Sequence, residues 1–375
     1  MAHKIPLVLA VVCSRWRQIV LDMPSLWINL VLTRHLRTDA LQDVQTLLAR
    51  AGLMPRSLTL LTRKRPVMPT LVHDLLAPYR YHRLSLCLHR DEVESLAALL
   101  TQNPQWTSEL RELALYKCHK SQFTHFTLFP PDAQLSEMSS LKLKVYQPID
   151  AQFLARAHLW HNMRHLHLST KIAARSAFEI LRHCHATLEM CHLVSNQDAT
   201  FATWVSSLTE SITLPHLRTL AVTFYDGHDV VPFIQPLVLP HLVSLSLFSP
   251  FSEEIYLSCD ASLFTHLTQR SNGMPHIEAV HIDRADDPVD MDVMLRAMPS
   301  LIEITLDPLS PLEEDALNEM VTGQLGPRLE RLYVGSTEEQ HEADLHRMEQ
   351  GRNRYAQSIN GSRRIPQLHL EFLPL

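Results

Sequence analysis

Glycine is scarce in this chain, with 8 glycines among 375 residues. Globular proteins usually contain about 7% glycine, and all-β folds need a turn roughly every ten residues. The scarcity therefore disfavours an all-β architecture and predicts frequent helices. It also leaves no glycine-rich phosphate-binding loop and no Gly-x-Ser-x-Gly nucleophile turn. We expect no catalytic residues and no enzymatic activity.

Long apolar runs and closely paired cysteines are also missing. Nowhere do about 18 apolar residues follow one another, as a membrane-spanning helix requires, so we expect no membrane partner. No Cys-x-x-Cys pair occurs among the six cysteines, which favours free thiols in a reducing compartment, the cytoplasm or the nucleus. A short signal peptide is the rival interpretation, because Lys4 precedes an apolar run over residues 5–13. No small-x-small cleavage site precedes Ser14, however.

Charge is unevenly distributed, although the whole chain has 34 basic and 40 acidic residues. Residues 1–90 contain 13 Lys and Arg against 4 Asp and no Glu, so the remainder is acidic. A basic segment can indicate nucleic-acid binding. These Arg residues are scattered among leucines rather than clustered, apart from Arg63-Lys64-Arg65, and proteins that bind single strands also need interleaved exposed aromatic residues. We therefore expect no nucleic-acid partner.

A sequence repeat runs through most of the chain. The pattern apolar-x-x-apolar-x-apolar occurs in ten full copies, about 28 residues apart on average. The middle apolar residues of these copies are Leu113, Leu141, Leu166, Cys191, Leu220, Leu245, Val280, Ile304, Leu332 and Leu368. Two weaker copies are centred on Leu58 and Leu84. Longer intervals predict insertions around residues 249–276 and 335–364.

Helical patterns separate the copies. Apolar residues recur at three-to-four spacing in residues 93–100, 153–157, 178–181 and 293–298. Each unit is therefore expected to be a short strand followed by a helix, and neither element can bury its apolar face alone. Stacking the units side by side predicts an α/β solenoid, in which a curved parallel sheet is covered by outer helices.

These units resemble leucine-rich repeats of the long, irregular kind. The resemblance assigns residues 33–375 to a leucine-rich-repeat solenoid of about twelve units. Such repeats commonly place Asn or Cys three residues after the third apolar position, and only Cys118 and Asn196 match that place. A regular asparagine ladder is therefore absent, and we expect other groups to satisfy the turns.

Residues 11–30 do not fit the repeat. They predict a helix that carries Val12, Trp16 and Ile19 on one face and ends near Pro24, followed by a turn anchored by Trp27. One interpretation is a small helical cap over the open edge of the first repeat, which solenoids require.

The same segment resembles the second half of an F-box, particularly the type joined to irregular leucine-rich repeats in basidiomycete fungi. The resemblance rests on Val-Cys-x-x-Trp-Arg followed by Pro-x-Leu-Trp. It assigns residues 1–32 to a partial F-box-like helical segment that is truncated at its amino end. It implies a non-catalytic substrate-recognition subunit of a cullin-RING ubiquitin ligase, without a cofactor. The residues that it implies for binding the adaptor subunit are Val12, Cys13, Trp16, Arg17, Pro24, Leu26 and Trp27.

Three alternatives stay open. A leucine-rich-repeat scaffold without ligase coupling needs the same fold and no adaptor, and a truncated or decaying gene copy has no function. An enzyme could use zinc, because His and Cys are clustered in residues 158–167 and 183–192. Their spacing matches no closed four-ligand pattern, and His341 and His346 lie too far apart around a helix to share a metal ion. We expect no metal site.

The expected protein-binding surface is the concave face of the sheet. Side chains alternate along a strand, so the residues that flank each middle apolar residue face away from the core. This face is basic and rich in histidine in the middle repeats and acidic toward the carboxyl end, so a partner with the opposite arrangement is complementary. The residues that we expect to bind an unknown protein substrate are Tyr116, Lys142, Lys144, His165, His167, His192, Asp283 and Asp307.

Overall fold

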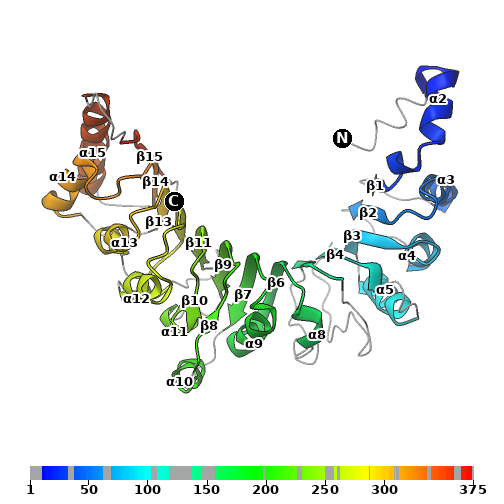
Figure 1. Cartoon of the computed structure of the whole chain (residues 1–375), viewed down its shortest axis with the longest axis horizontal. Helices are drawn as coiled ribbons and strands as arrows, with labels where there is room; N and C mark the ends of the chain where they lie inside the picture. Colours follow the sequence, from blue (N-terminus) through cyan, green and yellow to red (C-terminus); the bar gives the residue numbers. More distant parts are fainter. Residues whose placement is uncertain are drawn as a thin grey trace. The chain divides into compact units, whose positions relative to one another are not determined.

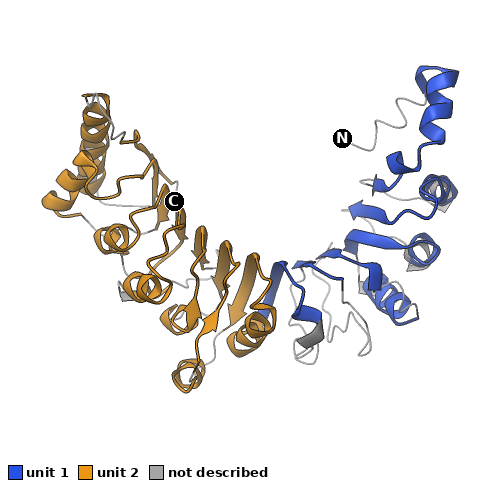
Figure 2. Ribbon diagram, viewed as in Figure 1, with its two compact units in different colours: residues 1–171 blue, residues 172–375 orange. Residues whose placement is uncertain are grey.

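The structure is a computed structural model of the chain. It describes residues 11–32, 38–61, 69–88, 90–102, 108–117, 137–144, 157–196, 200–208, 210–225, 230–249, 257–259, 262–286, 288–307, 309, 312–335, 339–358 and 365–373. The chain divides into two compact units, residues 1–171 and 172–375 (Figure 2). The division falls inside strand β6 (His165–Ala173).

Unit 1 combines a parallel sheet with helices. In chain order, its strands before β6 are β1 (Asn29–Leu32), β2 (Arg56–Leu61), β3 (Tyr81–Leu88), β4 (Glu112–Lys117) and β5 (Ser140–Lys144). Each of these strands pairs in parallel with the next one along the chain. Its α-helices are α2 (Ser14–Leu21), α3 (Thr38–Ala49), α4 (Pro69–Leu76), α5 (Arg90–Gln102) and α8 (Ala157–Trp160).

Unit 2 repeats this arrangement. Its sheet contains β7 (Met190–Asn196), β9 (Thr219–Phe224), β11 (Ser244–Phe248), β12 (Ala279–Ile282), β13 (Glu303–Leu306), β14 (Arg331–Val334) and β15 (His369–Phe372), again parallel. Its helices are α9 (Ala174–Cys184), α10 (Phe201–Ser206), α11 (Val231–Ile234), α12 (Ser262–Arg270), α13 (Met291–Ala297), α14 (Glu314–Thr322) and α15 (Glu339–Ser358). Two short strands, β8 (Ile212–Thr213) and β10 (Leu237–Val238), pair outside the main sheet.

The core of each unit lies between the sheet and the helices, which cover one face of the strands (Figure 1). The predicted middle apolar residues face one another across neighbouring strands, as in Leu58 with Leu84 and Leu220 with Leu245. These four side chains are at most 1% exposed. Burying a leucine contributes about 1.5–3 kcal/mol, so aligned apolar residues favour this register strongly. The α/β, solenoid-like arrangement predicted from the repeat is confirmed within each unit.

Two details of the repeat differ from the prediction. Leu332 pairs with Leu370 rather than Leu368. Asn353 on α15 explains the shift, because its side chain donates to the Leu368 carbonyl at 3.0 Å and accepts from the Leu368 N–H at 2.8 Å. Those bonds occupy the Leu368 backbone just before β15 begins. At the other end, β1 lies inside the segment assigned to the helical module, yet it pairs with β2.

Each of the two predicted insertions contains a helix. Helix α12 lies within residues 249–276, and the 20-residue helix α15 lies within residues 335–364. Each of these helices follows a strand and precedes the next, as the shorter helices do. The insertions therefore lengthen the connections without changing the order of strands.

Buried arginines take part of the role of the missing asparagine ladder. Arg56, only 5% exposed, donates its Nε–H to the Leu48 carbonyl at 2.9 Å. Arg352, fully buried on α15, donates to carbonyl oxygens of two successive turns in the last repeats, including those of Met320 and Leu329. Buried carbonyl groups need such partners, because an unsatisfied one costs about 1–3 kcal/mol.

Candidate functional site

The amino-terminal segment divides into a buried side and an exposed side. Its buried side consists of Val20 and Trp27, which pack with Ala51 of the first repeat. The Trp27 indole donates its Nε1–H to the Val20 carbonyl at 2.9 Å, and the Arg50 guanidinium lies 5.2 Å from the Trp27 ring centre. The segment therefore covers the start of the sheet, as a cap does.

The exposed side is apolar. Large hydrophobic side chains there are strongly exposed, with Val12 at 61%, Trp16 at 46%, Ile19 at 41% and Met23 at 44%. Isolated exposed hydrophobic residues are ordinary, but several on one short helix and its flanks form a patch of the kind that marks interaction sites.

The structure thus separates the residues that the F-box resemblance implies for adaptor binding. Trp27 is buried in the chain's own core, and Leu26 packs partly against it. The exposed members are Val12, Cys13, Trp16, Arg17 and Pro24. Cys13 lies at the amino end of α2, where its sulfur accepts the Trp16 N–H at 3.5 Å. Trp27 is buried because it packs with Ala51, whereas Trp16 is exposed. The motif itself does not contain Ala51, so the motif could not show this difference.

In unit 1, the predicted basic residues share the sheet face opposite the leucines. Lys142 pairs with His167 across β5 and β6, and His165 pairs with Ser140 in the preceding row. Tyr116 pairs with Lys144 in the following row. The Lys142 Nζ lies 5.7 Å from the Tyr116 ring centre, a cation–π contact. These five residues therefore form one surface, with Lys144 and His165 exposed and the others half-buried.

In unit 2, Asp283 and Asp307 come together, whereas His192 lies elsewhere on the sheet. The Asp307 N–H donates to the carbonyl of Ile282, which directly precedes Asp283, so the two aspartates leave neighbouring strands at the same level. His192 pairs with Ala221 on β9, and β11 then separates β9 from β12. The two aspartates and His192 are thus parts of one sheet but not of one cluster.

Two aromatic rings and one glycine complete this acidic cluster. The ring centres of Phe248 and His281, which strand alternation places on the sheet face opposite the core, are 4.9 Å apart on neighbouring strands beside Asp283. Sequence reasoning missed Gly335. Gly335 lies under Asp307, because a β-carbon at Gly335 would lie 1.9 Å from the Asp307 Oδ1. The sequence did contain a signal for Gly335, because a glycine at the end of a strand is unusual in a chain with so few glycines.

Burial controls the protonation of this cluster. It raises the pKa of Asp283, and the charge of Asp307 raises it further, while His281 and Arg284 oppose the shift. Burial also raises the pKa of Asp307, opposed by Arg284. Burial lowers the pKa of His281, although Asp283 and Glu303 act in the other direction. The ionised aspartates are thus partly desolvated, and a basic group from a partner would stabilise them.

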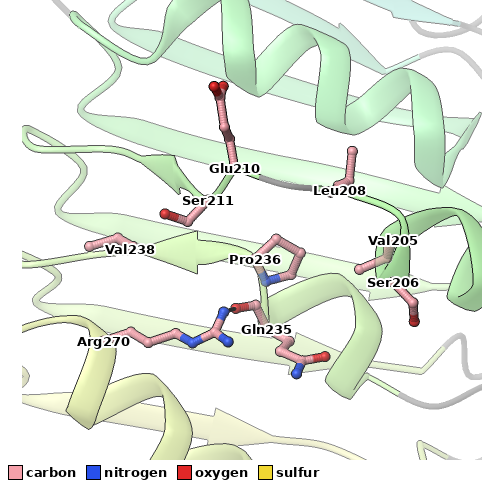
Figure 3. A pocket seen from close by; sticks show the side chains of 9 residues that line it. All are labelled: Val205, Ser206, Leu208, Glu210, Ser211, Gln235, Pro236, Val238 and Arg270. Atoms are coloured by element: carbon pink, nitrogen blue, oxygen red, sulfur yellow. Dashed lines mark hydrogen bonds between the residues drawn. The ribbon is translucent and has the colours of Figure 1, made fainter.

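A pocket on the helix side of unit 2 has a volume of about 670 Å³. Residues from the ends of α10 and α12 and from the β8–β10 pair line it (Figure 3). Glu210 and Arg270 are its charged residues, and the Glu210 carboxylate points away from Arg270 (Figure 3). Arg270 Nη1 donates to the Gln235 carbonyl. Its lining holds neither histidine nor cysteine.

The cysteines correct one sequence-based prediction. Cys87 on β3 is disulfide-bonded, although all six were expected to be thiols. Cys118 lies outside the described residues, and the free cysteines among the described ones are Cys13, Cys184, Cys191 and Cys259. Because disulfides are typical of oxidising compartments, cysteine usage no longer favours the cytoplasm or nucleus, which stays a prediction.

Metal and membrane sites were searched in the described part of the chain. No group of three or more His, Cys, Asp or Glu residues there could hold a metal ion. None of the helices there combines the length and apolarity needed to cross a bilayer. The buried thiols are poor ligands, since burial raises the pKa of Cys184 to about 12 and raises that of Cys191 well above its usual value.

Comparison with known proteins adds no family assignment. No protein-family model matches the chain, and no curated protein has a matching sequence.

Proposed function

We propose that this chain is a non-catalytic protein-recognition subunit that binds a partner protein on the exposed face of its parallel strands. The observation that carries the proposal is the chemistry of that face. Unit 1 presents Lys142, Lys144 and two histidines, and unit 2 presents the partly desolvated Asp283 and Asp307. Desolvated charges on an open sheet are unfavourable alone and favourable when paired, which is typical of binding surfaces.

We further propose that the amino-terminal segment couples the chain to the adaptor subunit of a cullin-RING ubiquitin ligase. The resemblance to an F-box supports this, together with the exposed apolar side chains of Val12, Trp16, Ile19 and Met23. A tryptophan at the centre of an apolar patch is the residue type that most often dominates binding energy at interfaces. In this proposal Trp27 positions the segment rather than touching the adaptor.

The second candidate is a scaffold of the same fold without ligase coupling. It is favoured by the burial of Trp27 and by its contact with Ala51, because a cap alone explains that half of the motif. In that case the exposed side of α2 makes no specific complex with the adaptor.

Binding to the purified adaptor subunit tests the ligase role. The adaptor is immobilised, and the full chain is compared with Trp16→Ala, Ile19→Ala and the control Leu53→Ala. Leu53 is 101% exposed and lies in the same unit but outside the amino-terminal segment. Leu53→Ala therefore removes a similar exposed apolar side chain without changing that segment. We expect saturable binding that Trp16→Ala weakens about tenfold or more, while Leu53→Ala leaves it unchanged.

Two results would count against adaptor coupling. One is absence of binding by the wild-type chain, and the other is equal binding by Trp16→Ala. The scaffold function would then stand, and it can be examined separately with charge reversals on the sheet face. Lys142→Glu with Lys144→Glu should reduce capture of an acidic partner, while Trp16→Ala should not.

A further inference from the structure

Three consecutive main-sheet strands of unit 2 are preceded by the same short motif. Pro215-His216-Leu217 precedes β9, Pro240-His241-Leu242 precedes β11, and Pro275-His276-Ile277 precedes β12. In each copy the aliphatic residue is buried, and its N–H donates to the carbonyl three residues earlier, at 3.3, 3.3 and 3.2 Å respectively. The three turns share this hydrogen bond, and each leaves its histidine exposed.

The parallel ladder aligns a second row of residues beside these histidines. The Arg218 carbonyl accepts the Val243 N–H at 2.8 Å, and the Val243 carbonyl accepts the Glu278 N–H at 2.8 Å. Arg218, Val243 and Glu278 therefore occupy equivalent positions, each two residues after a motif histidine. A charged residue thus stands at each end of this row, with an apolar one between them.

Both rows line one pocket at the amino ends of β9, β11 and β12. Its volume is about 380 Å³, and Pro215 completes its lining. The rings of His241 and His276 lie 5.2 Å apart with a 33° tilt, close to the ~4.8 Å that separates neighbouring strands. The volume falls within the range of small-molecule sites, about 300–1,000 Å³.

The lining is rich in N–H donors. Arg218 is always charged, and each imidazole donates one N–H when neutral and two when protonated. Glu278 is the only carboxylate among the lining residues. Donors and positive charge favour an oxyanion. A metal ion is disfavoured, because the Arg218 charge repels it and no three ligand residues of the described chain are arranged to hold one.

We propose that this pocket binds a small ligand that carries a phosphate group. Arg218, His216 and His241 donate hydrogen bonds to the phosphate oxygens, because Val243 separates this end from the Glu278 carboxylate. His276 stacks beside His241 and faces the rest of the ligand. The pocket lies at the strand ends rather than on the proposed partner-binding face, so either proposal can fail without the other.

Isothermal titration of the full chain with three probes tests the site: pyrophosphate, glycerol 3-phosphate and sulfate. We expect saturable binding of the phosphates, and a stronger response to the ester than to pyrophosphate identifies an organic phosphate as the better ligand. Arg218→Gln and His241→Gln should each raise Kd about tenfold, or about 1.4 kcal/mol. His266→Gln on α12 is the control, since His266 is exposed and outside the lining.

Thermal unfolding of each variant checks that it folds. The proposal is overturned by no saturable heat with any probe, by equal loss in His266→Gln, or by a zinc titration that saturates and excludes pyrophosphate.

Discussion

Arg352 allows a quantitative test of how this fold satisfies its turns. Its guanidinium is fully buried and donates to the carbonyl oxygens of Met320 at 2.9 Å, Gly326 at 3.0 Å, Leu329 at 3.1 Å and Pro366 at 3.3 Å. Burial lowers the pKa of Arg352 to about 10, so the group is still charged at neutral pH. Arg352→Met keeps an unbranched stem and removes all of these donors.

The size of the effect follows from two opposing contributions. Hydrogen bonds to a charged group contribute about 1.5–3 kcal/mol each, so the three shorter ones together contribute roughly 4.5–9 kcal/mol. Burying the guanidinium costs several kcal/mol, which methionine does not incur. We therefore expect Arg352→Met to lower the free energy of unfolding of unit 2 by roughly 3–5 kcal/mol.

Urea unfolding followed by circular dichroism measures this loss. Arg354→Met is the matched control on the same helix, because Arg354 is exposed and its Nε donates to the Gln350 carbonyl of its own helix. The control should change stability by less than about 0.5 kcal/mol. A loss below about 1 kcal/mol for Arg352→Met, or an equal loss for the control, would refute the proposed role of the buried arginine.

Two other predictions follow from the protonation of buried groups. Asp307→Asn should raise the unfolding temperature at neutral pH, because burial raises the Asp307 pKa and so makes its ionised form unfavourable. A carboxyl group whose pKa is raised by folding stabilises the folded state fully when the pH is below its unfolded pKa of about 4. This stabilisation is lost as the pH rises. The difference should therefore vanish near pH 3, and a constant difference would contradict it. Iodoacetamide labelling with mass spectrometry should modify exposed Cys13 in the native protein but reach Cys184 and Cys191 only on unfolding, because burial raises their pKa values. Equal native labelling would show that these thiols are accessible.

The sequence alone determined the repeating architecture. Leucines at a regular interval identify the strands, because an apolar residue aligned with its neighbours is buried wherever it stands in the stack, as Leu220 and Leu245 are. The same pattern assigned Lys142, His167 and their neighbours to the opposite face, since alternation along a strand is a local property. Local periodicity also predicts helix α2 and its apolar side.

Only the tertiary structure decided which residues meet. Whether Trp16 or Trp27 is buried depends on Ala51, and the register of β15 depends on Asn353 from a helix that no repeat pattern describes. Arg352, Gly335 and the three Pro-His turns likewise gain their roles from residues of neighbouring repeats. A periodic pattern specifies burial and order along the chain, whereas these contacts depend on how adjacent strands and helices align in space.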